Sequence, residues 1–204
     1  PICPMNADPS PAPADRQAPD GPHPALVEDL TARNRMAVEL RQRDAQLQCL
    51  SRFAQQLNAP LEVPAMLRAL VTTALELTGA AGGTAGLLIE GRMVFTEYRQ
   101  ADRWVPFEHR FEPGCGIPGC VMESRKPVLS ADAEHDPRLS PEIREAFGIH
   151  TLVHVPILDR RGELLGGLEL HNQAGRESFT DREVELLLGL AASLAVALEN
   201  TRLR

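Results

Sequence analysis

Residues 151–172, TLVHVPILDRRGELLGGLELHN, carry the pattern that decides the fold. Two apolar runs with period-two alternation flank the turn sequence DRRG at residues 159–162, which is typical of a β-hairpin. One face of the first run is purely apolar, with Val153, Val155 and Ile157. The hairpin therefore predicts a sheet that other elements cover on at least one side.

The apolar faces of the two runs also predict the strand register. We expect Val155 to lie opposite Gly166, because that pairing joins the apolar side chains on one face. The same register gathers four polar side chains on the other face: His150, His154, Glu169 and His171. These side chains either line a ligand cavity, or the histidines simply face solvent or are satisfied by local partners. A metal or haem iron on the histidines is a third alternative. The mid-strand glycines Gly166 and Gly167 indicate a close approach of a helix or a ligand.

Further strands are expected before the hairpin. Period-two alternation recurs in GLLIEGRMVFTEYRQ, residues 86–100, where Glu90-Gly91 suits a tight turn between two strands. WVPFEHRFE, residues 104–112, is another strand candidate. With the 151–172 hairpin, these segments predict an antiparallel sheet.

Two amphipathic helices frame the strands. Apolar spacing predicts a helix over residues 63–78 that stops at Gly79, a residue suited to a left-handed helix end. A second helix begins after Thr180, which forms a capping-box pattern with Glu183. Helices that enclose an antiparallel sheet make an α+β fold.

The chain divides into three segments by composition. Residues 1–24 are rich in proline and predict a disordered tail, and residues 58–204 hold the predicted α+β domain. Residues 25–57 predict a helix that serves as a coiled-coil linker or docks on its own domain. Its seam consists of Leu26, Leu30, Ala37, Leu40 and Leu47. Because the sequence starts at proline and stops inside a helical pattern, we expect an output domain outside this fragment.

Charge and composition exclude some functions. The net charge of -7 and the pI of about 5.4 leave no large positive field for a polyanion, so nucleic acid is not an expected partner. No continuous apolar run approaches the roughly 18 residues that span a bilayer, so no membrane partner is expected either. The cysteines lack CxxC spacing, which favours reduced thiols and a cytoplasmic location: Cys3, Cys49, Cys115 and Cys120.

Residues 112–138, EPGCGIPGCVMESRKPVLSADAEHDPR, form a glycine-bearing segment. A phosphate loop needs a preceding strand and a helix N-terminus in a βαβ unit, which this pattern does not supply. A zinc site would need two ligands beyond the two cysteines. We therefore expect the glycines to let the chain turn into a short helix at Val121.

Four stretches together resemble a GAF domain, the small-molecule-sensing module of many signalling proteins. They are LSRFAQQLNAPLEVPAMLRALVTTALELTGA, the glycine-bearing segment, LVHVPILDRRGELLGGLELHN and FTDREVELLLGLAASLAVALEN, and they cover roughly residues 50 to 200. The resemblance implies an antiparallel sheet with the terminal helices on one face and a ligand cavity on the other. It also implies a non-catalytic regulatory domain that senses a small ligand or a redox state and signals through its flanking helices.

Two subgroups of the family are matched incompletely. GAF-type free methionine sulfoxide reductases carry a reactive cysteine directly before the last glycine of this turn, where this chain has Pro118, and no cysteine follows Cys120. Cyclic-nucleotide-binding members resemble one another in an Asn-Lys...Phe...Asp-Glu pattern. Here Asn172 and Phe179 match, but Gln173 replaces the lysine. The sequence therefore assigns no cofactor, and it offers no Cys-His pair for a bilin.

The resemblance and the hairpin together suggest six ligand-binding residues and no catalytic or metal-binding one: Cys115, Asp132, Asp136, Arg138, His154 and Glu169. The expected function is a GAF sensor that binds an unidentified small molecule and pairs with a second copy. A methionine sulfoxide reductase-like enzyme and a ligand-free dimerisation module are the alternatives.

Overall fold

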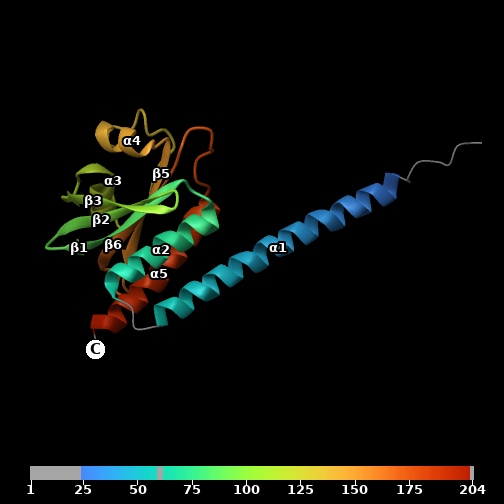
Figure 1. The fold of residues 1–204 in the computed structure, drawn as a ribbon, viewed down its shortest axis with the longest axis horizontal. Coiled ribbons are helices and arrows are strands. Elements are labelled where there is room, and N and C mark those ends of the chain that lie inside the picture. Colours follow the sequence, from blue (N-terminus) through green and yellow to red (C-terminus); the bar gives the residue numbers. More distant parts are fainter. Residues whose placement is uncertain (1–23, 59–61, 203–204) are drawn as a thin grey trace, which may run out of the picture. The chain divides into compact units, whose positions relative to one another are not determined.

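The computed structural model describes residues 24–58 and 62–202 (Figure 1). The predicted tail, except Pro24, and Cys3 fall outside these residues. The chain divides between Arg43 and Asp44 into two compact units. The elements are α1 (Pro24–Asn58), α2 (Val63–Thr78), β1 (Gly82–Ile89), β2 (Arg92–Gln100), β3 (Arg103–Phe111), α3 (Gly116–Ser124), β4 (Val128–Ser130), α4 (Pro141–Phe147), β5 (Thr151–Leu158), β6 (Leu164–Asn172) and α5 (Asp181–Arg202).

The strands form one six-stranded antiparallel sheet in the order β3-β2-β1-β6-β5-β4. Both predicted hairpins are present, and Glu90 and Gly91 have the positive φ values, 50 and 77°, of a two-residue hairpin turn. Helices α2 and α5 run side by side along one face of the sheet, and α3 and α4 lie toward the other (Figure 1). The predicted α+β class is confirmed.

The main core lies between α2, α5 and the sheet. Its fully buried members come from both layers and include Leu70, Val71, Val153, Val155, Leu170, Leu187, Leu190 and Leu194. Burial of each such side chain contributes about 1.5–3 kcal/mol. The end of α1 joins this core through Phe53, which is 1% exposed.

The ends of α2 and α5 follow the predicted capping signals. Gly79 adopts φ 63°, and its N–H donates to the Leu75 carbonyl at 2.7 Å. At α5 the backbone N–H of Thr180 donates to Glu183 Oε2 at 2.8 Å, and the N–H of Glu183 donates to Thr180 Oγ1 at 3.3 Å. Both sides of the capping box are therefore formed.

Helix α5 is apolar enough over Asp181–Thr201 to cross a membrane by length and composition. Scattered polar residues interrupt this segment, so it contains no long continuous apolar run. The apolar side of α5 packs into the main core, where Leu187, Leu190 and Leu194 are fully buried against the sheet.

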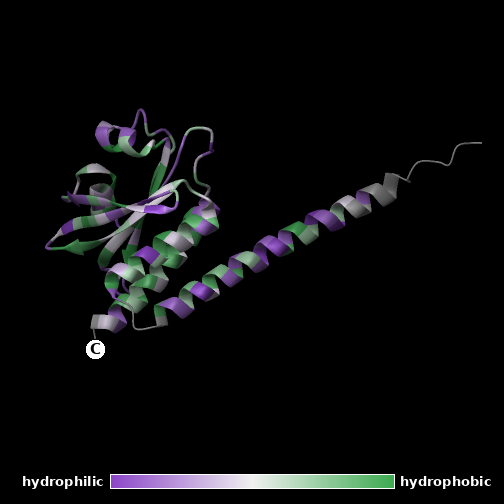
Figure 2. Ribbon diagram, in the orientation of Figure 1, coloured by the Kyte–Doolittle hydropathy of each residue, from purple (hydrophilic) through white to green (hydrophobic). Residues whose placement is uncertain are grey.

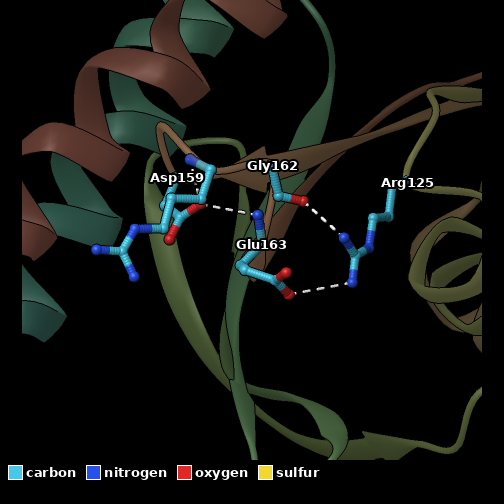
Figure 3. A network of polar contacts seen from close by, with 5 residues as sticks. Arg125, Asp159, Gly162 and Glu163 are labelled. Carbon is cyan, nitrogen blue, oxygen red and sulfur yellow. Dashed lines mark hydrogen bonds and ion pairs between the residues drawn. The ribbon is translucent and has the colours of Figure 1, made fainter.

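The predicted register of the β5–β6 hairpin is wrong by two residues. Val155 lies opposite Leu168, and Gly166 lies opposite Ile157. Asp159 Oδ1 accepts hydrogen bonds from the N–H groups of Arg161 and Glu163, which centres the turn further along the chain (Figure 3). Because the shift is even, the side chains from Thr151 to Ile157 and from Gly166 to Asn172 keep their predicted faces. The register shifts again at Leu158, which lies opposite Leu164, and Leu164 therefore lies on the face opposite to the one that strict alternation predicts.

The glycine-bearing segment turns as expected but enters its helix early. Gly114 and Gly116 have φ values of 75 and 68°, and α3 begins at Gly116 instead of Val121. A Cβ on Gly119 would meet the Glu112 carbonyl, so this position needs glycine for close backbone approach. The segment is a structural turn into a helix.

Helix α1 carries an exposed apolar seam. Met36, Leu40 and Leu47 are each at least 60% exposed. The side chains of Leu26 and Leu30, which the sequence also places in the seam, are outside those described. Apolar bands recur along the helix between polar ones (Figure 2).

Candidate ligand-binding site

A row of polar side chains crosses the sheet on the face opposite α2 and α5. His154 on β5 lies opposite Glu169 on β6, and Glu169 lies opposite Thr84 on β1. His171 lies two residues along β6. His154 and His171 have no exposed surface and Glu169 is 6% exposed, so the alternative of solvent-facing histidines is wrong for this pair.

His150 does not join this row. It precedes β5 and is exposed, and its backbone N–H donates to the Asn172 carbonyl at 2.8 Å. The expected alternation did not extend to His150 because the strand starts only at Thr151.

The His154 ring is positioned by a carboxylate that bonds to it and by a glycine that leaves space for it. Its Nδ1 lies 3.0 Å from Glu169 Oε2. A Cβ on Gly167 would clash with His154 Nε2, so the glycine makes room for the imidazole ring. Gly166 instead allows close approach of the backbone, because a Cβ there would clash with the Gly86 carbonyl. Close approach at these glycines was predicted for a helix or a ligand, but the groups that approach are a histidine ring and a neighbouring strand.

The other ring nitrogen of His154 has no partner. Nε2 is buried and makes no hydrogen bond with any residue that the structure describes. The nearest aromatic neighbour is Phe95, edge-on at 6.0 Å between ring centroids. Leaving a buried polar atom unpaired costs about 1–3 kcal/mol, so a ligand group or a water molecule that reached Nε2 would stabilise the site.

Tyr98 and His171 form a second, uncharged pair. The Tyr98 hydroxyl hydrogen-bonds to His171 Nδ1. Burial lowers the pKa of His171 to about 4, with the Phe147 backbone opposing the shift. Burial and the Glu169 carboxylate raise the pKa of Tyr98 well above its usual value. At neutral pH both groups are therefore neutral. Tyr98, His154, Glu169 and His171 are called the polar cluster below.

Tyr98 enters the cluster through a β-bulge. The β2–β3 register shifts between Phe95 and Glu97, so the side chains of Phe95 and Tyr98 lie on the same face. There they belong to one buried cluster, which consists of Met93, Phe95, Tyr98, Phe107 and Leu164. Thr84 Oγ1 donates to the Glu97 carbonyl at 2.6 Å, which gives this carbonyl a hydrogen-bond partner at the irregular point of the strand. Strict alternation would have placed Tyr98 on the opposite face, and no residue in the strand signals the bulge.

Helix α4 closes the cluster with an aromatic ring. Phe147 stacks on Tyr98 with ring centroids 3.9 Å apart, and Phe107 packs edge-on against Phe147 at 5.4 Å. A groove of about 350 Å³ lies beside these rings, and His109, Ile143 and Phe147 contribute to its wall. The residues that could admit a ligand to the polar cluster are therefore on α4.

Four predicted site residues lie apart from the cluster. Cys115 is exposed at the N-cap of α3, and Asp132 is exposed and bonds to His135 at 2.7 Å. Asp136 accepts two hydrogen bonds from the Arg138 guanidinium, which holds the pKa of that carboxyl far below its usual range. No hydrogen bond between described residues joins these four side chains to the polar cluster. Of the six predicted residues, the structure brings together His154 and Glu169.

The described residues hold neither a disulfide nor a cluster of three potential metal ligands. Cys49, Cys115 and Cys120 are free thiols. Within residues 24–58 and 62–202, no group of three His, Cys, Asp or Glu side chains is placed to hold a metal ion.

These observations define a small α+β domain with an open antiparallel sheet, a helical layer on one face and a buried polar cluster on the other. The family model of the GAF domain matches residues 60–199, and the chain belongs to the GAF domain family. The resemblance inferred from the sequence is therefore confirmed.

Curated proteins and solved structures are similar to this chain. A dual 3′,5′-cyclic-AMP and -GMP phosphodiesterase 11 from Drosophila melanogaster is 32% identical over 98 residues, which cover 47% of this chain and 7% of that protein. The GAF domain of a phosphoenolpyruvate-protein phosphotransferase from Coxiella burnetii superimposes with a TM-score of 0.63 at 24% identity, over 77% of this chain and 94% of that one. The free methionine-R-sulfoxide reductase of Neisseria meningitidis, in complex with its substrate, gives 0.63 at 17% identity, over 77% and 90%. At these identities the structural likenesses concern the fold.

Proposed function

We propose that this GAF domain is a non-catalytic regulatory module that binds a small polar molecule at the polar cluster. The observation that carries the proposal is the unpartnered Nε2 of a fully buried His154, held in place by Glu169. Membership of the GAF domain family, together with the similarity to part of a phosphodiesterase, supports a regulatory role.

The geometry of His154 suggests the chemistry of the ligand. With Nδ1–H donating to Glu169, a neutral imidazole presents Nε2 as a hydrogen-bond acceptor. A ligand with an N–H or O–H donor would satisfy this atom. If the ring is protonated, Nε2 becomes a donor and an acidic ligand is favoured instead.

Ligand entry requires movement of Phe147. Its ring covers Tyr98 and it is the last residue of the seven-residue helix α4, directly before Gly148. Gly148 has φ 63°, a conformation that glycine adopts without strain. We propose that ligand binding displaces this short helix, and that α1 and α5 pass the change to an output domain.

A second copy of the chain is the proposed partner of α1. The exposed side chains of Met36, Leu40 and Leu47 follow a spacing of four and seven residues, the spacing of a coiled-coil seam.

The free thiols agree with a reducing compartment, and we propose a cytoplasmic location.

Native mass spectrometry of the purified chain tests the proposal, because a retained small molecule would appear as a mass that denaturation removes. His154→Ala should abolish its retention, whereas His150→Ala, a change at an exposed histidine next to the same strand, should leave it intact. Retention by both variants would overturn the site.

An enzymatic alternative needs its own assay. Consumption of free methionine sulfoxide with a dithiol reductant should not exceed the level without protein. Turnover that Cys115→Ser abolishes would refute the non-catalytic role and favour the methionine sulfoxide reductase alternative.

A further inference from the structure

A second cavity lies on the opposite face of the sheet from the polar cluster. It has a volume of about 220 Å³ and lies where α2 passes over β1, β2 and β3. Nine of its twelve lining residues are apolar, and the lining consists of Val63, Pro64, Leu67, Arg68, Val71, Ala85, Leu87, Ile89, Val94, Thr96, Glu97 and Trp104. Ala85 and Leu87 alternate along β1 with Thr84, whose side chain belongs to the polar row, so the sheet separates the two sites.

Two local features shape the cavity: a small side chain on β1 beneath α2, and the bulge in β2. Ala85 forms part of the floor and is 7% exposed. The bulge in β2 turns Thr96 and Glu97 toward the same side, where both line the cavity. The same bulge places Tyr98 in the polar cluster on the other face, so one irregularity of β2 shapes both sites.

The rim of the cavity is charged but internally neutralised. The Arg68 guanidinium donates two hydrogen bonds to the Glu97 carboxylate, one of them at 2.6 Å. This pairing lowers the pKa of Glu97 and raises the pKa of Arg68, so both groups stay ionised and compensate each other. Arg68 and Arg99 lie 5.6 and 5.8 Å from the Trp104 ring centroid, and Arg99 in turn lies 3.7 Å from Asp102. The cavity therefore offers an apolar interior and no net charge for an ionic ligand.

We propose that this cavity binds a small neutral aromatic molecule, one ring with one polar substituent. An apolar cavity of about 150 Å³ is large enough for benzene, so this one has room for a substituted ring. Trp104 supplies an aromatic wall, and the hydroxyl of Thr96 and the Glu97 carboxylate at the rim can bond the substituent. A charged ligand would lose its hydration against the apolar floor without gaining an unpaired counter-charge.

Trp104 makes the proposal directly testable, because it is the chain's single tryptophan. Tryptophan emission of the full chain should respond to benzyl alcohol with a saturable shift. Benzoate, the same ring with a carboxylate, should bind at least about tenfold more weakly, because its charge must be desolvated.

Two leucine substitutions separate the cavity from general effects. Ala85→Leu fills the floor and should weaken the response at least about tenfold, whereas Ala192→Leu, on the exposed side of α5, should leave it unchanged. Thermal unfolding checks that both variants fold. Should Ala85→Leu fail to fold, methyl NMR of the unmodified chain decides, with shifts on benzyl alcohol addition expected at Leu67, Val71 and Leu87.

The proposal would be overturned by a linear, non-saturating response, by an equal response in folded Ala85→Leu, or by methyl shifts scattered away from the cavity. Emission that changes with protein concentration in the absence of probe would mean that a second copy covers the cavity, and this also overturns it. Because the two sites are on opposite faces, His154→Ala should leave benzyl alcohol binding intact, whatever the fate of the proposed regulatory ligand.

Discussion

Acid should destabilise this domain through His171. Burial lowers the pKa of His171 from its ordinary 6.5 to about 4, so the folded domain binds the proton less well than the unfolded chain. The neutral ring therefore contributes stability that is complete above about pH 6.5 and is lost as the pH falls toward about 4. From these two pKa values, the free energy of unfolding should fall by about 2 kcal/mol between neutral pH and about pH 5.

The assay is urea unfolding followed by circular dichroism at both pH values. His171→Asn removes the titrating ring and keeps a polar group near the Tyr98 hydroxyl, so its pH dependence should be smaller by about 2 kcal/mol. His150→Asn is the matched control at an exposed histidine and should keep the full dependence. An identical pH dependence in the original chain and in His171→Asn would refute the reasoning, as would an NMR titration of His171 near pH 6.5.

Three further changes test separate features of the structure. Gly167→Ala should lower the free energy of unfolding by about 1–3 kcal/mol in urea titrations, because the added Cβ meets the His154 ring. Gly189→Ala, with open space around it on α5, should instead raise the free energy of unfolding by up to about 1 kcal/mol. Equal effects of the two substitutions would contradict the packing at Gly167. Leu40→Glu should shift the chain from dimer to monomer in sedimentation at tens of micromolar, and a chain that is monomeric before the substitution would contradict the seam. Cys120→Ala should cost on the order of 1 kcal/mol in thermal unfolding and leave the fold intact, because the thiol is free, so loss of folding would show that it has a structural role.

Several features were determined by the sequence alone because they depend on neighbouring residues. The α2 stop at Gly79, the α5 capping box at Thr180 and Glu183, and the turn at Glu90-Gly91 all rest on contacts within a few positions. The period-two pattern likewise placed His154 and Glu169 on one face, because the apolar residues of both strands must share the other face and this excludes any shift by an odd number of residues.

The candidate sites were decided by the tertiary structure, because they depend on contacts between distant segments. The hydrogen bonds of Asp159 set the hairpin register, and the β2 bulge brought Tyr98 beside His171. Whether the polar face meets water or protein depends on α4, whose Phe147 covers it from outside the sheet. The apolar cavity under α2 arises where a helix crosses three strands, so alternation along any one strand predicts its apolar side chains but not the space between them.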